Sequence, residues 1–403
     1  MIRRIAATQL LPGMFVVHLH KHWLEHGFWR QRFLVRDGAV INRLIEDGID
    51  EVSIDTDRGR DVPERPVPGL ARVEASLLAL AARGQRRPPT ISLGEERRRS
   101  ARLLREAGAV VQDLLNGPRL GLPVDAGRLE PLVGRMIDSV ERHPDALIPM
   151  ARLKEGGAYT AEHAVAAAAL AIGLARQQGL AHAQVEQVAL GMLLKDIGQV
   201  SLDARFEGKA GRLSQDERSL LHNHVEEGLA VLEANTRLSP TSAAVVLEHH
   251  ERFDGSGYPY RRPGVELSVA GRMAAIVDSY DAMTADRPYR AALSPAAALR
   301  QVFSAGGGQF DPVLVAAFVR TVGIYPVGTL VRLESGHLAV VEEAHSEQLL
   351  SPVVRVIYHA GRRQYVAPVR VDLARKFGNH YGRIVGAAEF SAWGISAIRW
   401  QPV

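Results

Sequence analysis

The sequence predicts a mainly α-helical protein whose helical core follows a small α/β module and precedes a small β-rich domain. Apolar residues recur at helical spacing from residue 95 to about residue 323. After Pro326, β-branched residues alternate with polar ones. In the first 60 residues, apolar and polar residues alternate between turn residues. The 403 residues are enough for about two or three domains of ordinary size.

Residues 1–60 are expected to form the small α/β module. The Pro12-Gly13 pair breaks the first apolar stretch, and Asp37-Gly38 in FLVRDGAVI is typical of a β-hairpin turn. The following NRLIEDGIDEVSI predicts a short helix that leads into a strand. Residues 61–95 are rich in Pro, Gly and Arg, and they predict a linker with one short helix.

Helical spacing dominates residues 96–323. The segment ERRRSARLLREAGAVVQDLL places its apolar residues on one stripe, and we expect its arginines on a solvated face. Residues 96–148 are therefore expected to be connecting helices that lead into a helical domain at residues 149–323. Further helices are expected to begin near Asp125, Thr160, Ala183, Ser214, Ser239, Ala270 and Ser294.

The last 80 residues predict a small β-domain. The segments VGTLVRLESGHLAVVEEA and SPVVRVIYHAGRRQYVAPVRVDL are β-branched and alternating. Ser335-Gly336 and Ala360-Gly361 are the expected turns. We expect this domain to span residues 324–403.

Composition excludes several classes of protein. The chain has no cysteine, so a metal must be held by histidines and carboxylates. The formal net charge of +4 is too small to predict bulk nucleic-acid binding, and we expect no DNA partner, although a small anionic ligand would fit. The longest apolar run, residues 164–175, is short against the roughly 20 residues of a membrane span. With no cleavage-site pattern at the N-terminus, we expect a cytoplasmic protein without a membrane span.

Six side chains of metal-ligating type lie on or beside predicted helices of the core. Imidazole nitrogens and carboxylate oxygens suit Fe, Mn and Zn, and a carboxylate can bridge two ions. Two such ions can hold a hydroxide and clamp a phosphodiester. The candidates are His163, Asp196, His224, His249, His250 and Asp278.

Each candidate also has an ordinary structural explanation. His163 begins an Ala-rich helix, where a histidine is often only partly buried and structural. Asp196 could close a helix. Adjacent histidines such as His249 and His250 point about 100° apart on a helix, so one could face solvent. The order and spacing of the whole set favour one common site.

Two segments resemble a known family. HHERFDGSGYP, residues 249–259, and DSYDAMTADRPYR, residues 278–290, are similar to the hallmarks of HD-GYP domains. That family is the bacterial branch of the HD superfamily that hydrolyses cyclic di-GMP. The resemblance covers residues 149–323 and implies an HD-type helical bundle core. Residues 1–60 resemble a domain of unknown function that often precedes HD-GYP domains, and the β-rich tail resembles their common extension.

The resemblance implies one or two divalent transition ions, Fe, Mn or similar, ligated by the six candidates, with Asp196 shared between two ions. It also implies that Arg287 and Arg290 contact the substrate phosphates. Gly257 and Tyr258 belong to the GYP loop, residues 257–259, where Tyr258 offers a stacking face for guanine. In this family the loop has been linked to docking of a partner such as a diguanylate cyclase, and a homodimer is left open.

The sequence departs from the family pattern at two adjacent catalytic positions. Lys195 stands where the family has the histidine of its HD dipeptide, and Gln199 stands where it usually has a lysine. A protonated ammonium cannot donate a lone pair to a metal, and it repels one nearby. The second change removes a cation that the resemblance places beside the scissile phosphate.

Three arrangements of Lys195 follow. In the first, the ammonium takes one metal position and pairs with Asp196 and Asp278. In the second, a single ion remains on Asp196 and the histidines, with weak hydrolysis. In the third, Lys195 points away and water replaces the missing ligand. The first two are favoured, because losing an imidazole ligand weakens metal affinity severely.

The sequence therefore predicts a cyclic di-GMP signalling protein with weak or absent hydrolysis. One alternative is an active metal-dependent phosphodiesterase that yields the linear dinucleotide or GMP. Another is a non-catalytic ligand sensor or a docking scaffold for a diguanylate cyclase. A nucleotidase-type HD hydrolase is disfavoured, because such enzymes lack the GYP loop.

Overall fold

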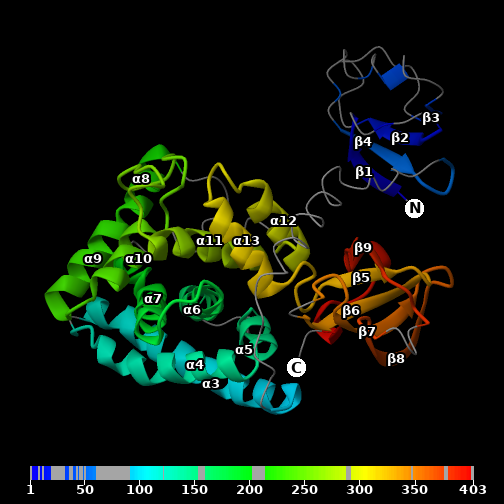
Figure 1. The fold of residues 1–403 in the computed structure, drawn as a ribbon. Helices are drawn as coiled ribbons and strands as arrows, with labels where there is room; N and C mark the ends of the chain where they lie inside the picture. Colours follow the sequence, from blue (N-terminus) through cyan, green and yellow to red (C-terminus); the bar gives the residue numbers. More distant parts are fainter. Residues whose placement is uncertain are drawn as a thin grey trace. The chain divides into compact units, whose positions relative to one another are not determined.

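The computed structural model divides the chain into two compact units, Met1–Ala75 and Ser76–Val403. The sequence-coloured ribbon in Figure 1 identifies the parts of each unit. The boundaries expected at residues 60, 95, 148 and 323 stay predictions. The described residues are 2–7, 10, 13–19, 32–35, 40–41, 44, 49, 51–59, 91–120, 122–152, 159–201, 214–286, 292–345, 348–375 and 380–400.

The first unit contains a four-stranded antiparallel sheet in the order β1-β4-β2-β3. Alternating residues of these strands, among them Val16 and Val52, are fully buried in one apolar cluster. The expected strand at EVSI is present as β4, whereas the Asp37-Gly38 turn and the linker helix lie outside the described residues. The strands are β1 (Ile2–Ala6), β2 (Phe15–Leu19), β3 (Phe33–Leu34) and β4 (Glu51–Asp55).

Helices form most of the second unit. They are α3 (Leu93–Asn116), α4 (Glu130–Arg142), α5 (Pro144–Ala151), α6 (Tyr159–Gln177), α7 (His182–Leu194), α8 (Gln215–His222), α9 (His224–Asn235), α10 (Pro240–Glu248), α11 (Val269–Thr284), α12 (Pro295–Ser304) and α13 (Pro312–Val322). Short 3-10 turns add η3 (Gly117–Leu120), η4 (Ala126–Leu129) and η5 (Ile197–Ser201).

Every expected helix start lies within one residue of an observed one, with the start near Asp125 appearing as the 3-10 turn that leads into α4. The reason is local, because serine side chains accept hydrogen bonds from the first-turn backbone of several of these helices.

One expectation is wrong. Arg97, in the arginine run of α3, is buried and donates to the backbone oxygen of Glu342, 2.9 Å away, whereas Arg98 and Arg99 are exposed as expected.

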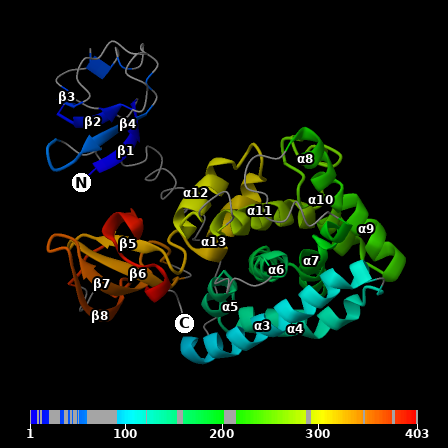
Figure 2. The same ribbon diagram turned by 180° about the vertical axis from the view of Figure 1, so that it is seen from behind.

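The Ala-rich helix α6 lies at the centre of the helical bundle. Every residue from 163 to 175 is buried, because small side chains let neighbouring helices approach from all sides. Helices α3, α5, α7, α11 and α13 all contact it. Figures 1 and 2 show α6 between the α3–α4 pair and the α11–α13 pair. No helix in the described ranges combines the length and hydropathy that crossing a membrane requires.

The C-terminal part is a five-stranded antiparallel sheet in the order β8-β7-β6-β5-β9, which confirms the expected β-rich tail. The expected turns Ser335-Gly336 and Ala360-Gly361 join β5 to β6 and β7 to β8. Two apolar clusters hold its side chains. The elements are β5 (Leu330–Leu333), β6 (His337–Glu343), β7 (Val353–His359), β8 (Gln364–Asp372), β9 (Ile384–Ala388), η6 (Ser391–Trp393) and η7 (Ile398–Trp400).

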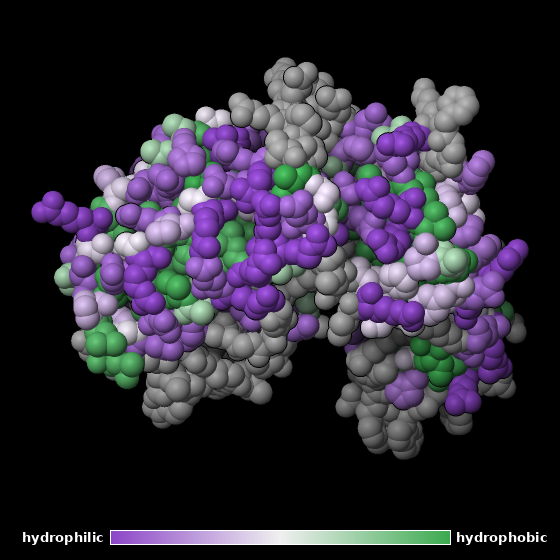
Figure 3. All heavy atoms as spheres, turned by 90° about the horizontal axis from the view of Figure 1, so that it is seen from below, coloured by the Kyte–Doolittle hydropathy of each residue, from purple (hydrophilic) through white to green (hydrophobic). Residues whose placement is uncertain are grey.

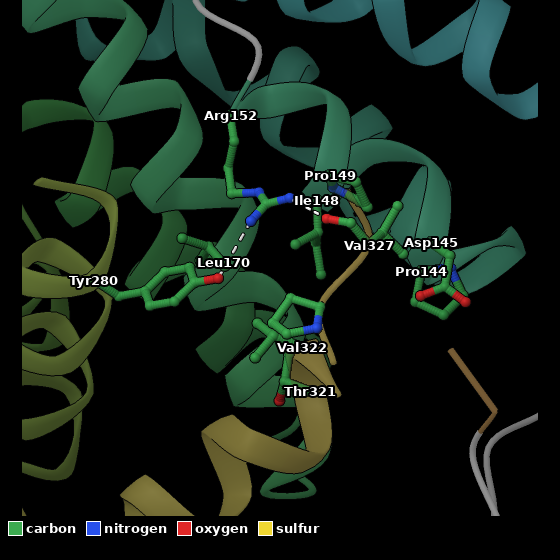
Figure 4. A pocket seen from close by; sticks show the side chains of 11 residues that line it. Pro144, Asp145, Ile148, Pro149, Arg152, Leu170, Tyr280, Thr321, Val322 and Val327 are labelled. Carbon is green, nitrogen blue, oxygen red and sulfur yellow. Dashed lines mark hydrogen bonds between the residues drawn. The ribbon is translucent and has the colours of Figure 1, made fainter. Parts of the chain in front are cut away.

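Arg152 joins the start of this sheet region to the bundle. Its guanidinium donates to the backbone oxygen of Val327, 2.5 Å away, and to the hydroxyl of Tyr280, 3.2 Å away. Figure 4 shows the guanidinium between these two groups, at a small pocket lined by α5 and the end of α13. Among the residues drawn in colour in Figure 3, polar residues predominate and hydrophobic residues lie in scattered patches.

Candidate metal centre

Five parts of the bundle bring the six sequence-predicted candidates into one buried site. His163 lies on α6, Asp196 directly follows α7, His224 begins α9, and Asp278 lies on α11. His249 and His250 follow α10. Helices α7 and α11 both pack against α6 and against α10, and this packing closes the site from several sides.

The candidates form two overlapping sets whose ligand atoms lie within 4.8 Å of one another. We call Asp196, His224, His249 and His250 the four-residue set. His163, Asp196 and Asp278 form the three-residue set. Asp196 belongs to both, in the position that the sequence analysis expects of a carboxylate shared between two ions.

Lys195 fills the middle of the three-residue set. Its side chain is 1% exposed, and its ammonium donates to an oxygen of Asp196 and to Oδ1 of Asp278, 2.7 Å away. The same nitrogen lies 3.1 Å from Nε2 of His163. All three members of the set therefore face an ammonium, which is the first of the three arrangements expected for Lys195.

The charges in this set are mutually stabilised. Burial disfavours the charged ammonium, but Asp196 and Asp278 outweigh it and raise the pKa of Lys195. Burial likewise opposes ionisation of the two aspartates, and Lys195 overcomes it and lowers both pKa values. A positive ammonium between two carboxylates thus supplies one positive charge where a divalent ion would bring two.

His163 also faces carboxylates through both ring nitrogens. Nδ1 lies 2.7 Å from Oδ2 of Asp281, and Nε2 lies 2.9 Å from Oδ1 of Asp278. Burial and the charge of Lys195 lower the pKa of His163. The hydrogen bonds to Asp278 and Asp281 raise this pKa by more, so the net result is a raised pKa. Because the Lys195 ammonium lies between its three members, the three-residue set does not fit a divalent ion while Lys195 is present.

The four-residue set has the opposite character. Nδ1 of His224 donates to the backbone oxygen of Leu221 at 2.5 Å, and Nδ1 of His249 donates to that of Val246 at 2.7 Å. These hydrogen bonds fix a proton on Nδ1 of each ring, so Nε2 is the atom available as a metal ligand. The two Nε2 atoms lie 3.4 Å apart, and 3.7 and 3.9 Å from Oδ1 of Asp196.

Burial keeps two of these imidazoles neutral. It lowers the pKa of His249 to about 3, with a further contribution from Lys195, and it lowers that of His250 well below 6.5. Neutral imidazoles and an ionised carboxylate are the donors that Fe, Mn and Zn accept. The four-residue set therefore fits one divalent transition ion. Gln199 donates to the same Oδ1 of Asp196 at 2.7 Å and so lies at the edge of this set.

A close helix contact positions His224. A β-carbon added to Gly198 in η5 would lie 2.0 Å from the backbone oxygen of His224 and 2.5 Å from the backbone nitrogen of Gly228. Only glycine permits this approach without moving α9. Gly198 therefore lets the segment that follows Asp196 pack directly against the helix that carries His224.

The GYP loop lies beside the four-residue set. A β-carbon on Gly257 would lie 2.4 Å from the backbone nitrogen of Arg252, so only glycine fits there. Tyr258 stacks on His250, with ring centroids 4.6 Å apart, and on His222, 3.7 Å apart. The two expected phosphate contacts, Arg287 and Arg290, lie outside the described residues.

Two residues that support the site, Asp281 and Glu251, were not among those predicted from the sequence. Asp281 orients His163, and its spacing of three residues from Asp278 on a helix was the available signal, because such residues share a face. Glu251 is buried and accepts hydrogen bonds from two backbone nitrogens just after the GYP loop, those of Tyr260 and Arg261, at 2.7 and 3.0 Å. No spacing rule in the sequence indicates the second role.

Known families and proteins match both the N-terminal part and the helical part of this chain. The HD domain family matches residues 135–314, and the family called Domain of unknown function (DUF3391) matches residues 2–129. The cyclic di-GMP phosphodiesterase PA4108 of Pseudomonas aeruginosa is 40% identical over 394 residues, which are 98% of this chain and 94% of that protein.

Shorter matches cover mainly the helical region. The cyclic di-GMP phosphodiesterase response regulator RpfG of Xanthomonas campestris pv. campestris is 33% identical over 36% of this chain and 39% of its own length. The solved structure of Bd1817, a HDG"Y"P protein of Bdellovibrio bacteriovorus, is 14% identical, with a TM-score of 0.48 over 79% of this chain and 98% of that one. The assignment does not depend on that structural likeness.

HHERFDGSGYP and DSYDAMTADRPYR lie in the helical region of the chain. The Pseudomonas aeruginosa relative is similar over nearly the whole chain, including the parts on both sides of that region. The HD domain match covers all six candidate positions, from α6 to α11. The chain belongs to the HD-GYP branch of the HD domain family, with an HD-type helical bundle core that follows an N-terminal DUF3391 domain.

Proposed function

We propose that this protein binds cyclic di-GMP at the candidate metal centre and hydrolyses it slowly or not at all. The ligand class is supported by relatives that are cyclic di-GMP phosphodiesterases, one of them similar over nearly the whole chain. The loss of activity is supported by one observation: the Lys195 ammonium lies between His163, Asp196 and Asp278.

The ammonium and a divalent cation cannot share the three-residue set. Two positive charges within a few ångströms repel each other strongly in a buried site, and Lys195 is held there by two carboxylates. The protein therefore binds a single ion, on the four-residue set. In two-metal sites, one ion stabilises the attacking oxygen and the other the leaving oxygen during in-line displacement at a phosphodiester. In this protein a fixed ammonium, with a single positive charge, stands in place of one of the two ions.

The residues present have defined roles in this proposal. Asp196, His224, His249 and His250 would hold the ion, and when bound it would polarise a phosphoryl oxygen of the ligand. Hydrogen bonds through Nδ1 orient His224 and His249, while Asp281 and Asp278 hold His163. Gln199 offers a neutral amide where the family usually has a lysine, so the charge beside the phosphate is also reduced.

The test combines metal analysis with a hydrolysis assay on the purified full-length protein. We expect about one Fe or Mn per chain and turnover far below that of an intact family member. The double variant Lys195→His with Gln199→Lys is expected to bind about two ions and to hydrolyse cyclic di-GMP at least about tenfold faster. Wild-type protein that carries two ions and turns over like an intact family member would refute the proposal.

A non-catalytic sensor is the second candidate, and the same Lys195 contacts favour it. It predicts that cyclic di-GMP binds with no detectable turnover under any metal condition. Slow but metal-dependent turnover would instead identify a weak phosphodiesterase. Docking of a diguanylate cyclase through the GYP loop and assembly into a homodimer stay predictions, and a pull-down and a measurement of mass in solution test them.

A further inference from the structure

Tyr258 of the GYP loop has an imidazole on each face of its ring. His250 covers one face, with centroids 4.6 Å apart and an angle of 29° between the ring planes. His222 covers the other, with centroids 3.7 Å apart and an angle of 10°. The His222 contact is the closer and the more nearly parallel of the two. The stacking face that Tyr258 would offer to a base is therefore covered in this conformation.

The two imidazoles lie in different surroundings. His250 belongs to the four-residue set and lies next to His249, with ring centroids 4.0 Å apart, so its face of Tyr258 stays covered while the site is intact. His222 is the last residue of α8, a helix on which no described side chain is buried. Leu220 of the same helix is 50% exposed. His222 therefore lies on a helix whose described side chains are all at least partly exposed, whereas His250 belongs to the metal-binding set.

The outer face of Tyr258 is also in the right place for a base. The Tyr258 ring stacks directly on His250, which belongs to the four-residue set. A guanine on the outer face of Tyr258 would be separated from that set by the tyrosine ring alone. An imidazole and a purine are both flat aromatic rings, so both can stack on the same tyrosine face but not at once.

We propose that His222 occupies the base-stacking face of Tyr258 and competes for it with a guanine of cyclic di-GMP. His222 thus limits affinity at the candidate metal centre, and the ligand binds by displacing it. This inference rests on the proposed function, because that function supplies the ligand.

The test measures cyclic di-GMP affinity by calorimetry on the full-length, Mn²⁺-loaded protein. The variant His222→Ala frees the outer face of Tyr258, and we expect it to bind roughly 2–10-fold more tightly than wild type, the range typical of one aromatic contact. The variant His222→Phe keeps a flat ring against Tyr258, and we expect its affinity to equal the wild-type value or fall below it. His182→Ala removes an exposed histidine at the start of α7, paired only weakly with Glu186 at 3.4 Å, and is the matched control with unchanged affinity.

Each outcome bears on one conclusion. Unchanged affinity in His222→Ala overturns the inference and leaves the proposed function in place. Weaker binding in His222→Ala also overturns it, because His222 would then be part of the platform on which the base stacks. If wild type and every variant fail to bind cyclic di-GMP, the proposed function and the inference both fall. Tight binding by His222→Ala alone supports both.

Discussion

Replacing Lys195 with methionine tests the electrostatic role assigned to it. Methionine is unbranched and of similar length, so the substitution removes the charge with little change in packing. At the 2.7 Å distance between Nζ and Oδ1 of Asp278, an effective dielectric constant of about 20 corresponds to a gross attraction of about 6 kcal/mol. The cost of burying the charges offsets part of this attraction. Breaking a buried ion pair by removing one partner typically destabilises a protein by about 3–5 kcal/mol.

The assay is thermal unfolding of metal-free protein followed by titration with Mn²⁺. At about 2–4 °C per kcal/mol for a domain of this size, Lys195→Met should lower the unfolding temperature by roughly 6–20 °C. Because the variant frees the three-residue set, Mn²⁺ should then stabilise it more than it stabilises wild type. A ligand at a hundred times its Kd contributes about 2.7 kcal/mol per site.

A surface ion pair provides the matched control. Arg135 donates to Glu106 at 2.6 Å, but the two side chains are 49% and 52% exposed. Arg135→Met should therefore cost under about 1 kcal/mol and leave the response to Mn²⁺ unchanged. The reasoning about Lys195 is refuted if metal-free Lys195→Met unfolds at the wild-type temperature, or if Mn²⁺ stabilises variant and wild type equally.

Three further predictions concern the supports of the site. Glu251→Ala leaves two loop N–H groups without their acceptor, which should cost about 1–3 kcal/mol and speed amide exchange after the GYP loop; unchanged exchange contradicts it. Gly198→Ala should destabilise the bundle by more than about 3 kcal/mol in chemical denaturation, whereas Gly134→Ala, with open space around it, should stabilise α4 by up to about 1 kcal/mol. Burial opposes ionisation of Glu96, but its contacts with Arg142 prevail and lower the pKa of Glu96 below 4.5. The Glu96–Arg142 pair therefore stabilises the fold above that pH. Its contribution to stability disappears as the pH falls through the lowered pKa. The unfolding-temperature difference between wild type and Arg142→Met should therefore narrow from about pH 6 to about pH 3, and a constant difference contradicts this.

Much of the fold follows from short-range sequence signals. The helix starts were predicted to within a residue, because capping serines act on backbone groups three residues away. The Ala-rich stretch of α6 indicated a buried helix, and it is the central one. Arg97 is the exception. Its neighbours Arg98 and Arg99 are exposed, but its burial depends on a strand more than two hundred residues later.

The list of candidate ligands was also predictable, whereas its electrostatic state was not. Motif order indicated which imidazoles and carboxylates belong together, and the helix packing brings all six into one site. The sequence left three orientations open for Lys195, because its neighbour Asp196 is available to it as a partner but does not by itself fix where a four-carbon side chain ends. Contact with Asp278, on a helix far along the chain, selects one of them.

The sequence alone determined the family, the helical core and the residue types available for chemistry, since these depend on local periodicity and on motifs of a dozen residues. The tertiary structure decided how those residues are used. It placed an ammonium inside one set of donors, kept His249 and His250 neutral in the other set, and covered both faces of Tyr258. The physical reason is that charge balance and ring stacking depend on distances of 3–5 Å between side chains from different helices, which only the packing of those helices establishes.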